Sequence, residues 1–194
     1  MNLLNLPYSP VMDEPRLYKL TVDQYIKMID TGLFHPEEKV ELVEGQLFCK
    51  GRIEELHAHC VNRLVNVLFR ALTDTKFDIS AQNPIRLENS RPEPDLVVQT
   101  KSSWETGGDP TAKDVLLIVE VAHSSLAFDR EVKLSIYASS GIKHYWIVNL
   151  DLNQVEVYQG PSQGTYNDKR VFKPGEQVIV PLLNKKITVS DFLD

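Results

Sequence analysis

The chain has 194 residues and a formal net charge of −6, and 42% of its residues are hydrophobic. This length suits one domain, and this hydrophobic content excludes a wholly disordered chain. The acidic balance argues against a protein that attracts nucleic acid through its overall field, but it leaves room for an enzyme with a local basic cleft. No apolar run approaches the ~20 residues that cross a membrane.

The chain is expected to divide into an extended N-terminal arm, residues 1–20, and one domain, residues 21–194. Three prolines interrupt the arm, which lacks the basic opening of a signal peptide. The two cysteines belong to no metal-ligand or CxxC pattern, so we expect reduced thiols in a cytoplasmic protein.

The first elements of the domain are a helix and a hairpin. Thr21 and Gln24 have the spacing of a capping box, which predicts a short helix that ends near Gly32. Two apolar runs on either side of Gly45 predict two strands joined by a tight turn. These strands are expected over residues 40–44 and 46–49.

A longer helix is predicted over residues 54–72, where apolar side chains recur at helical spacing. His57 falls on this apolar stripe, whereas His59 does not. Further strands are expected over residues 77–87, 95–99, 114–121, 143–150, 154–158 (an outer strand), 177–180 and 186–189. A polar loop is expected over residues 102–111, a helix that Ser124 and Ser125 can cap over about 124–140, and turns after Gly160.

The order of these elements sets the fold class. A buried strand, a helix and a second buried strand in succession imply parallel strands joined by a crossover. The expected class is therefore α/β, bordering on α+β, with a mixed sheet flanked by helices.

Two carboxylates interrupt the strands that are predicted to be most buried. Asp95 precedes the run Leu96–Val98, and Glu120 ends the run Val115–Val119. A buried carboxylate is costly unless a cation or a hydrogen bond satisfies it. The 25 residues between the two acids allow them to face each other across neighbouring strands, where they would suit Mg²⁺ or Mn²⁺, with the backbone carbonyl of Val121 as a further ligand.

A lysine on the following helix completes this pattern. Lys133 lies thirteen residues after Glu120, about two turns into the predicted helix, so its amine can point back toward the strand ends. There it would hold a water molecule or neutralise charge on a phosphate. Asp129 lies four residues earlier on the same face and can orient the amine.

Several short motifs together carry a family resemblance. They are Pro94-Asp95, Glu120-Val121, Asp129 with Lys133, Tyr137 followed by Gly141–Val148, Glu44-Gly45, His57 and the segment Leu182–Leu193. From about Thr21 onward the chain resembles the Uma-two family of restriction endonucleases, within the PD-(D/E)XK nuclease superfamily. The resemblance implies a restriction-endonuclease-like fold and DNA as the substrate.

The same resemblance implies a catalytic set, which consists of Glu44, Asp95, Glu120 and Lys133. It gives Glu44 access to a metal, directly or through water, and it gives His57 a contact with substrate or with one of the acids. The lysine that the superfamily places two residues after the glutamate is here Ala122. In this family Lys133 of the next helix is expected to replace it.

Each residue also has an ordinary structural explanation. Asp95 suits the start of a strand, and Glu120 suits a buried ion pair. Glu44 suits a hairpin turn, and His57 suits a buried interior position. Their joint occurrence favours a metal-dependent DNA endonuclease in which the metal and Lys133 activate water.

Two alternatives stay open. One is a catalytically silent nuclease-fold module that binds nucleic acid or protein, which the acidic balance and the lack of an evident basic stripe favour. The other is a metal-dependent hydrolase that acts on RNA or a nucleotide. A two-fold homodimer is attractive for an endonuclease, because two sites can cut both strands.

Overall fold

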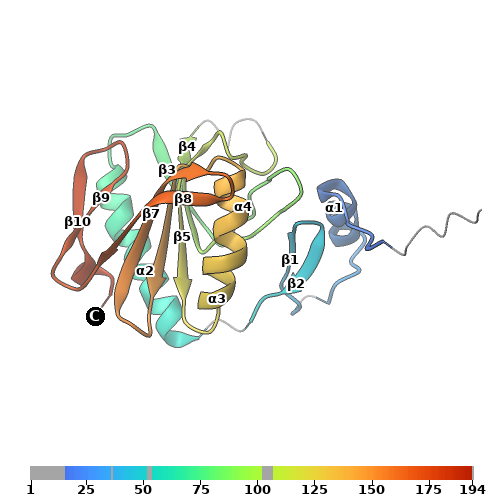
Figure 1. The fold of residues 1–194 in the computed structure, drawn as a ribbon, viewed down its shortest axis with the longest axis horizontal. Coiled ribbons are helices and arrows are strands. Elements are labelled where there is room, and N and C mark those ends of the chain that lie inside the picture. The colour runs from blue at the N-terminus through green and yellow to red at the C-terminus, as the bar shows by residue number, and fades with distance from the viewer. Residues whose placement is uncertain (1–15, 36, 52–53, 102–106, 194) are drawn as a thin grey trace, which may run out of the picture.

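The computed structural model describes residues 16–35, 37–51, 54–101 and 107–193. A six-stranded sheet in the order β3-β4-β5-β6-β7-β8 forms its centre, with helices on both faces (Figure 1). This arrangement confirms the predicted mixed sheet flanked by helices. Most of the predicted arm, and residues 102–106 of the predicted loop, lie outside the described residues, whereas residues 16–20 have no regular secondary structure.

The central strands are β3 (Phe77–Ala81), β4 (Leu96–Thr100), β5 (Val115–Ala122), β6 (His144–Asn149), β7 (Gln154–Ser162) and β8 (Thr165–Phe172). The neighbours β5 and β6 are parallel, as the strand–helix–strand order predicts, and the other neighbouring pairs are antiparallel. All eight residues of β5 are buried. Such a strand is covered on both faces, which explains its uninterrupted apolar run.

Two layers cover the sheet (Figure 1). One contains α2 (Glu55–Leu72), the hairpin of β9 (Gln177–Val180) and β10 (Lys185–Thr188), and the 3₁₀ turn η3 (Val189–Asp191). The other contains α3 (Leu126–Phe128), the π-helical turn η2 (Asp129–Lys133) and α4 (Leu134–Ser139). Each layer has its own apolar cluster, so β5 and β6 contribute side chains to two cores.

The N-terminal part of the domain consists of α1 (Val22–Asp30) and the hairpin of β1 (Val40–Val43) and β2 (Gln46–Cys49). The capping box of α1 forms as predicted. The hairpin turn has positive φ at both Glu44 and Gly45, as a two-residue turn of this twist requires. The hairpin docks on the segment before β4 through the bond from Arg91 N–H to the carbonyl of Leu42, at 2.7 Å.

Three predictions about the elements are wrong. The strand expected over residues 77–87 ends at Ala81. The strand expected to be an outer one, β7, lies inside the sheet, because β8 forms the edge where turns were expected. The α-helix expected over 124–140 contains a π turn. In the described part of the chain, no helix has the length and apolarity needed to cross a membrane.

Candidate active site

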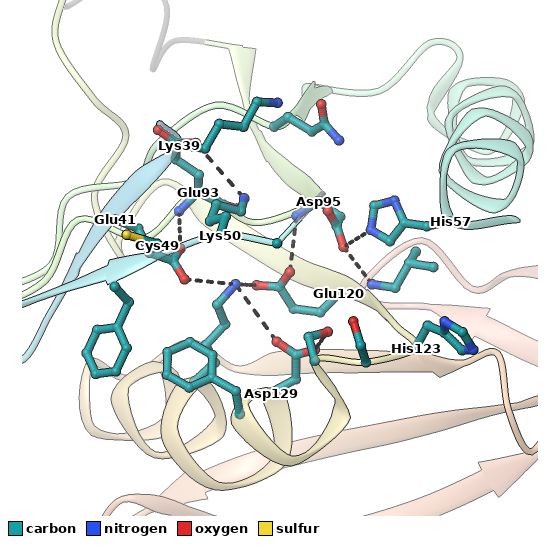
Figure 2. Close-up of a pocket in the computed structure, with 18 of the residues that line it drawn as sticks. Lys39, Glu41, Cys49, Lys50, His57, Glu93, Asp95, Glu120, His123 and Asp129 are labelled. Atoms are coloured by element: carbon teal, nitrogen blue, oxygen red, sulfur yellow. Dashed lines mark hydrogen bonds and ion pairs between the residues drawn. The ribbon is translucent and has the colours of Figure 1, made fainter. Parts of the chain in front are cut away.

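A pocket of about 310 Å³ opens where the C-terminal end of β5 meets the β1–β2 hairpin, the start of α2 and the turn η2 (Figure 2). Charged side chains dominate its lining. The acids are Glu41, Glu54, Glu93, Asp95, Glu120 and Asp129, the lysines are Lys39, Lys50 and Lys133, and the histidines are His57 and His123. Acids outnumber lysines by two to one, so the pocket favours a bound cation.

Strand register brings Asp95 and Glu120 together. Leu96 of β4 lies opposite Val119 of β5, so the next residues outward, Asp95 and Glu120, also face each other. The backbone N–H of Asp95 donates to Oε2 of Glu120 at 3.3 Å. The backbone N–H of Val121 donates to Oδ2 of Asp95 at 2.8 Å. Because each acid accepts a bond from the other strand, the strand ends hold both carboxylates in position.

Three buried carboxylates share the ammonium group of Lys133. Its Nζ lies 3.0 Å from Oε1 of Glu120. It also lies 3.6 Å from Oε1 of Glu41 and 3.9 Å from Oδ1 of Asp129. Figure 2 shows these three acids converging from different elements. Burial lowers the pKa of Lys133, but the three acids raise it by more, to above its ordinary value, so the group remains a cation.

One ammonium does not neutralise this cluster. Burial raises the pKa of Glu120, Lys133 lowers it, and Asp95 and Asp129 raise it again, so the pKa is about 8. The hydroxyl of Tyr137 donates to Oε1 of Glu120 at 2.8 Å, beside the Lys133 ammonium. Burial is the main cause of the raised pKa, and the neighbouring acids Asp95 and Asp129 add to it.

His57 supports Asp95 from the first turn of α2. Its Nε2 lies 3.0 Å from Oδ2 of Asp95. Burial lowers the pKa of His57, but the bond to Asp95 raises it above its ordinary value. Burial raises the pKa of Asp95, but His57 and the N–H of Val121 lower it below its ordinary value. Asp95 is therefore held ionised.

The segment that carries Asp129 and Lys133 is wound as a π turn. The backbone N–H of Leu134 bonds to the carbonyl of Asp129, five residues earlier. Ser125, which was expected to cap the helix, makes no side-chain cap and instead donates from Oγ to Oδ2 of Asp129 at 2.6 Å. Single π turns inside helices are common at functional sites, where they re-aim side chains. Here both charged side chains point into the pocket.

The structure does not bring Glu44 to the pocket. Glu44 occupies the hairpin turn, where its side chain is exposed. Its backbone N–H donates to Oγ of Ser90, outside the pocket. The acid that this hairpin supplies is Glu41, three residues earlier, which is 3% exposed. Oε2 of Glu41 accepts the N–H of Glu93 at 3.1 Å, so the acid is fixed in place.

Sequence reasoning missed Glu41 although a signal was present. Glu41 lies inside the apolar run Val40–Val43, which is the same signal that singled out Glu120. His123 was also missed, and no pattern in the sequence marks it. Its Nδ1 lies 2.5 Å from Oε2 of Glu54, and its Nε2 lies 3.0 Å from Oδ1 of Asp151.

Asp95 and Glu120 are the residues best placed to hold a divalent metal. Among the described residues, no group of three or more His, Cys, Asp and Glu side chains forms a ready-made metal site. A Mg²⁺ ion does not need one, because it binds one or two carboxylates and completes its shell with water and substrate oxygens. The N–H of Val121 faces Asp95. In an extended strand the carbonyl of the same residue faces the same side, so it is a possible third ligand.

Two solved structures resemble this chain. The first is a protein of Anabaena variabilis ATCC 29413, described as a "putative nuclease belonging to DUF820", which has a TM-score of 0.70 and 19% sequence identity. The match covers 89% of this chain and 97% of that chain, and it shows that the two share a fold. The second is the type IIG restriction endonuclease BpuSI, with a TM-score of 0.41 and 16% identity, over 74% of this chain and 16% of that chain. That likeness is too weak to carry an argument.

A search of curated proteins gives no match. The whole domain nevertheless matches one protein family, whose description is "Putative restriction endonuclease", over residues 22–190. The resemblance inferred from the sequence motifs is thus confirmed: the chain belongs to the Uma2 family of nuclease-like proteins.

Proposed function

We propose that this protein is a metal-dependent DNA endonuclease that hydrolyses phosphodiester bonds in the pocket at the end of β5. The observation that carries the proposal is the convergence of Asp95 and Glu120, with the Nζ of Lys133 3.0 Å from Glu120, in a pocket that opens to solvent. Family membership and the fold support a nuclease. The metal, the substrate and the roles of the residues are our inference.

The residues present fit a bound Mg²⁺ or Mn²⁺. The donors that converge are hard carboxylate oxygens, which these ions prefer, and the acids that line the pocket outnumber its lysines. Asp95, Glu120 and the carbonyl of Val121 would hold it. When bound, such an ion polarises the phosphate and lowers the pKa of an attacking water.

Lys133 contributes a fixed positive charge. Because its pKa is raised, it does not serve as a general base; its N–H groups donate to the attacking water or to the phosphoryl oxygens. Glu41 and Asp129 hold the ammonium from two sides, and Glu120 fixes it from a third. Removing one such preorganised donor costs about 10²- to 10³-fold in rate in other enzymes.

The Asp95–His57 pair sets the ionisation of the site. The bond from His57 to Oδ2 keeps Asp95, which lines the pocket, a carboxylate. His57 therefore acts through Asp95 as a positioning residue. A catalytically silent module that kept only the fold would not need an ionised Asp95. The His57–Asp95 pair therefore favours the endonuclease over the silent module.

A cleavage assay tests the proposal. Purified protein is incubated with supercoiled plasmid, duplex oligonucleotide, single-stranded DNA and RNA, with Mg²⁺, with Mn²⁺ and with EDTA. We expect metal-dependent cleavage of DNA, and a loss of at least about 100-fold in Glu120→Gln and in Asp95→Asn. Cleavage confined to RNA would support the alternative hydrolase instead.

A matched control is Glu44→Gln, which removes a carboxylate of the same hairpin outside the pocket and should retain the wild-type rate. Absence of cleavage above the Glu120→Gln background under every metal would overturn the proposal. A two-fold homodimer would provide two such pockets for a double-strand cut. Light scattering measures the mass in solution that tests this part.

A further inference from the structure

A second hollow, of about 610 Å³, lies between α2 and the β9–β10 hairpin, on the layer that packs against β5 from the side opposite α4. Figure 1 shows α2 and this hairpin side by side. Four cations line the groove, namely Arg63, Arg70, Lys185 and Lys186, and one acid, Asp191. We call it the basic groove. A local excess of positive charge stands out on a chain whose net charge is −6.

The cations of α2 form one stripe along the helix. Arg63, Asn66 and Arg70 are spaced i, i+3 and i+7, and all three are exposed. With a rise of 1.5 Å per residue, Arg63 and Arg70 lie about 10 Å apart along the axis. The opposite stripe, which includes Leu64 and Leu68, is fully buried against the sheet. The burial of one stripe therefore fixes the orientation of the other.

The cations of β10 complete the groove from the other wall. Ile187 of β10 is buried against α2, and Lys185 Nζ donates to the carbonyl of Thr73, just after the end of α2, at 3.4 Å. These contacts hold Lys185 and Lys186 beside the arginines. Residues more than a hundred positions apart in sequence thus form one basic surface, which explains why the sequence shows no evident basic stripe.

The basic groove is connected to the candidate active site through α2. His57, in the first turn of α2, lines the pocket and bonds to Asp95. His59, one residue off the apolar stripe, is exposed and continues the row of Arg63 and Arg70 toward the pocket. Arg63 lies about 9 Å beyond His57 along the helix axis, and Arg70 about 20 Å. His57 and this row lie on different sides of α2 but within about 20 Å along its axis, so a duplex that lies across the helix can contact both the pocket and the groove.

The charge pattern fits a phosphodiester backbone. Phosphates of one DNA strand recur about every 3.4 Å along the duplex axis, so a 10 Å row of cations spans about three of them. The pocket itself is rich in acids and offers little attraction to DNA without a metal. Affinity for the polyanion must then come from another surface. The lining of the basic groove has such an excess of cations.

We propose that the basic groove binds the phosphate backbone of the DNA duplex that is cut in the pocket, an inference that rests on the proposed function. The contacts are electrostatic and independent of sequence. Release of counterions makes such binding fall steeply with salt, with a log–log slope of about −0.9 for each neutralised phosphate. Four cations therefore account for a slope of about three to four.

The test measures duplex binding by fluorescence anisotropy over a series of salt concentrations, in EDTA so that no cleavage occurs. The groove variant carries R63Q, R70Q, K185Q and K186Q. We expect its Kd at 100 mM salt to rise at least about tenfold and its salt slope to fall by about three. The half variants R63Q/R70Q and K185Q/K186Q should each show about half of the change in slope expected for the fourfold variant. They provide a second measurement if the fourfold variant folds poorly.

The control is K113Q/K143Q, which removes two charges and so matches each half variant. Lys113 and Lys143 are exposed and precede β5 and β6. They therefore lie near the N-terminal ends of these strands, whereas the pocket lies at the C-terminal end of β5. This variant should keep the wild-type Kd and slope. If the groove variant binds DNA as the wild type does, or if the control loses as much, the proposal is wrong.

Cleavage kinetics separate this proposal from the proposed function. Where both hold, the groove variant raises KM at least about tenfold and changes kcat by less than about threefold. Wild-type cleavage with unchanged KM in the groove variant would overturn the groove alone. If the wild type cuts no DNA but the groove variant has a smaller salt slope than the wild type, the groove is supported and the endonuclease is overturned.

Discussion

At the scale of single residues, three buried carboxylates pair with one ammonium group, that of Lys133. Glu41, Glu120 and Asp129 all lie within 4.0 Å of the Nζ of Lys133, and all are at most 3% exposed. Removing one member of a buried ionic cluster usually costs more than the cluster contributes, because a charge is left without its partner. Substitutions that keep the shape of the side chain are therefore the informative ones.

Glu41 and Glu44 offer a matched pair of acids from one hairpin. Glu41→Gln keeps the acceptor for the N–H of Glu93 but removes the charge that holds Lys133. We expect kcat for DNA cleavage to fall about 10- to 100-fold with KM unchanged, because Lys133 is then aimed less accurately. Glu44→Gln should change kcat by less than about twofold. Single-turnover cleavage of a labelled duplex measures both.

Equal effects of the two substitutions would contradict the placement of Glu41 as a positioning residue for Lys133. The melting temperatures of both variants serve as the control for folding. A loss of rate in Glu41→Gln that came with a large loss of stability would point to a structural part only. Because Glu120 and Asp129 still pair with Lys133, we expect that loss to be small, of the order of 1 kcal/mol.

Asp95, Glu120 and Lys133 were predicted from the sequence to lie together, and the prediction had a physical reason. Acids in apolar strands, and a lysine two helical turns further on, are expensive to bury alone, so their joint burial predicts a shared site. Asp95, Glu120 and Lys133 are indeed together. Glu44 was instead predicted from the family resemblance, and Glu41 was overlooked. The apolar neighbours of Glu41 carried the better signal.

At the scale of elements, the π turn η2 is anchored from both sides. Lys133 and Asp129 face the pocket, whereas Arg130, between them in sequence, donates to Glu156 of β7. The side chain of Glu156 is fully buried and also accepts from Lys169 of β8 and the hydroxyl of Tyr158. Strands β7 and β8 thereby help to fix the turn that carries Lys133.

Glu156 should make stability depend on pH in acid. Burial raises its pKa, but bonds from Arg130, Lys169 and Tyr158 lower it more, to about 2 from an ordinary value of 4.5. The folded chain thus binds this proton more weakly than the unfolded chain. The stabilisation is complete above about pH 4.5 and is lost as the pH falls from about 4.5 to about 2.

The variant Glu156→Gln tests this dependence. Because Arg130 and Lys169 are partly exposed, we expect a cost of about 2 kcal/mol at pH 7, or about 4–8 °C in melting temperature. The deficit should shrink as the pH falls below about 4.5, so that it is clearly smaller at pH 3 than at pH 7, and it should approach zero only near pH 2. Thermal unfolding by circular dichroism between pH 3 and pH 7 gives the comparison. A deficit that does not change with pH would show that packing, not charge, sets the contribution.

The elements that sequence predicted correctly are those whose burial leaves a regular pattern. Strand β5, buried along its whole length, and helix α2, with its apolar stripe, are the clearest. Strand β8 was missed because its residues Thr165–Phe172 are mostly polar and exposed. Its strand conformation comes from pairing with β7 through the two-residue turn Gln163–Gly164, and sequence periodicity does not report pairing.

At the scale of the whole molecule, opposite charges are separated. The acids cluster at the end of β5, and the cations of α2 and β10 cluster on the layer beside it. The formal net charge of −6 hides this division, which is why composition argued against nucleic-acid binding. A folded chain can attract a polyanion with one surface and hold a cation with another.

Because the acids cluster at the end of β5, we expect a divalent metal to raise the stability of the folded chain. A ligand that binds the folded state and not the unfolded state stabilises it by RT ln(1 + [L]/Kd), about 2.7 kcal/mol at 100 times Kd. For a chain of this size we expect saturating Mn²⁺ or Mg²⁺ to raise the melting temperature by about 5–10 °C relative to EDTA. The double variant Asp95→Asn/Glu120→Gln should lose this rise, because both carboxylate ligands are gone. Glu156→Gln, which weakens the fold away from the pocket, should start lower and keep it. A rise of equal size in the wild type and in the double variant would place the metal elsewhere, and no rise in the wild type would count against a metal in this pocket.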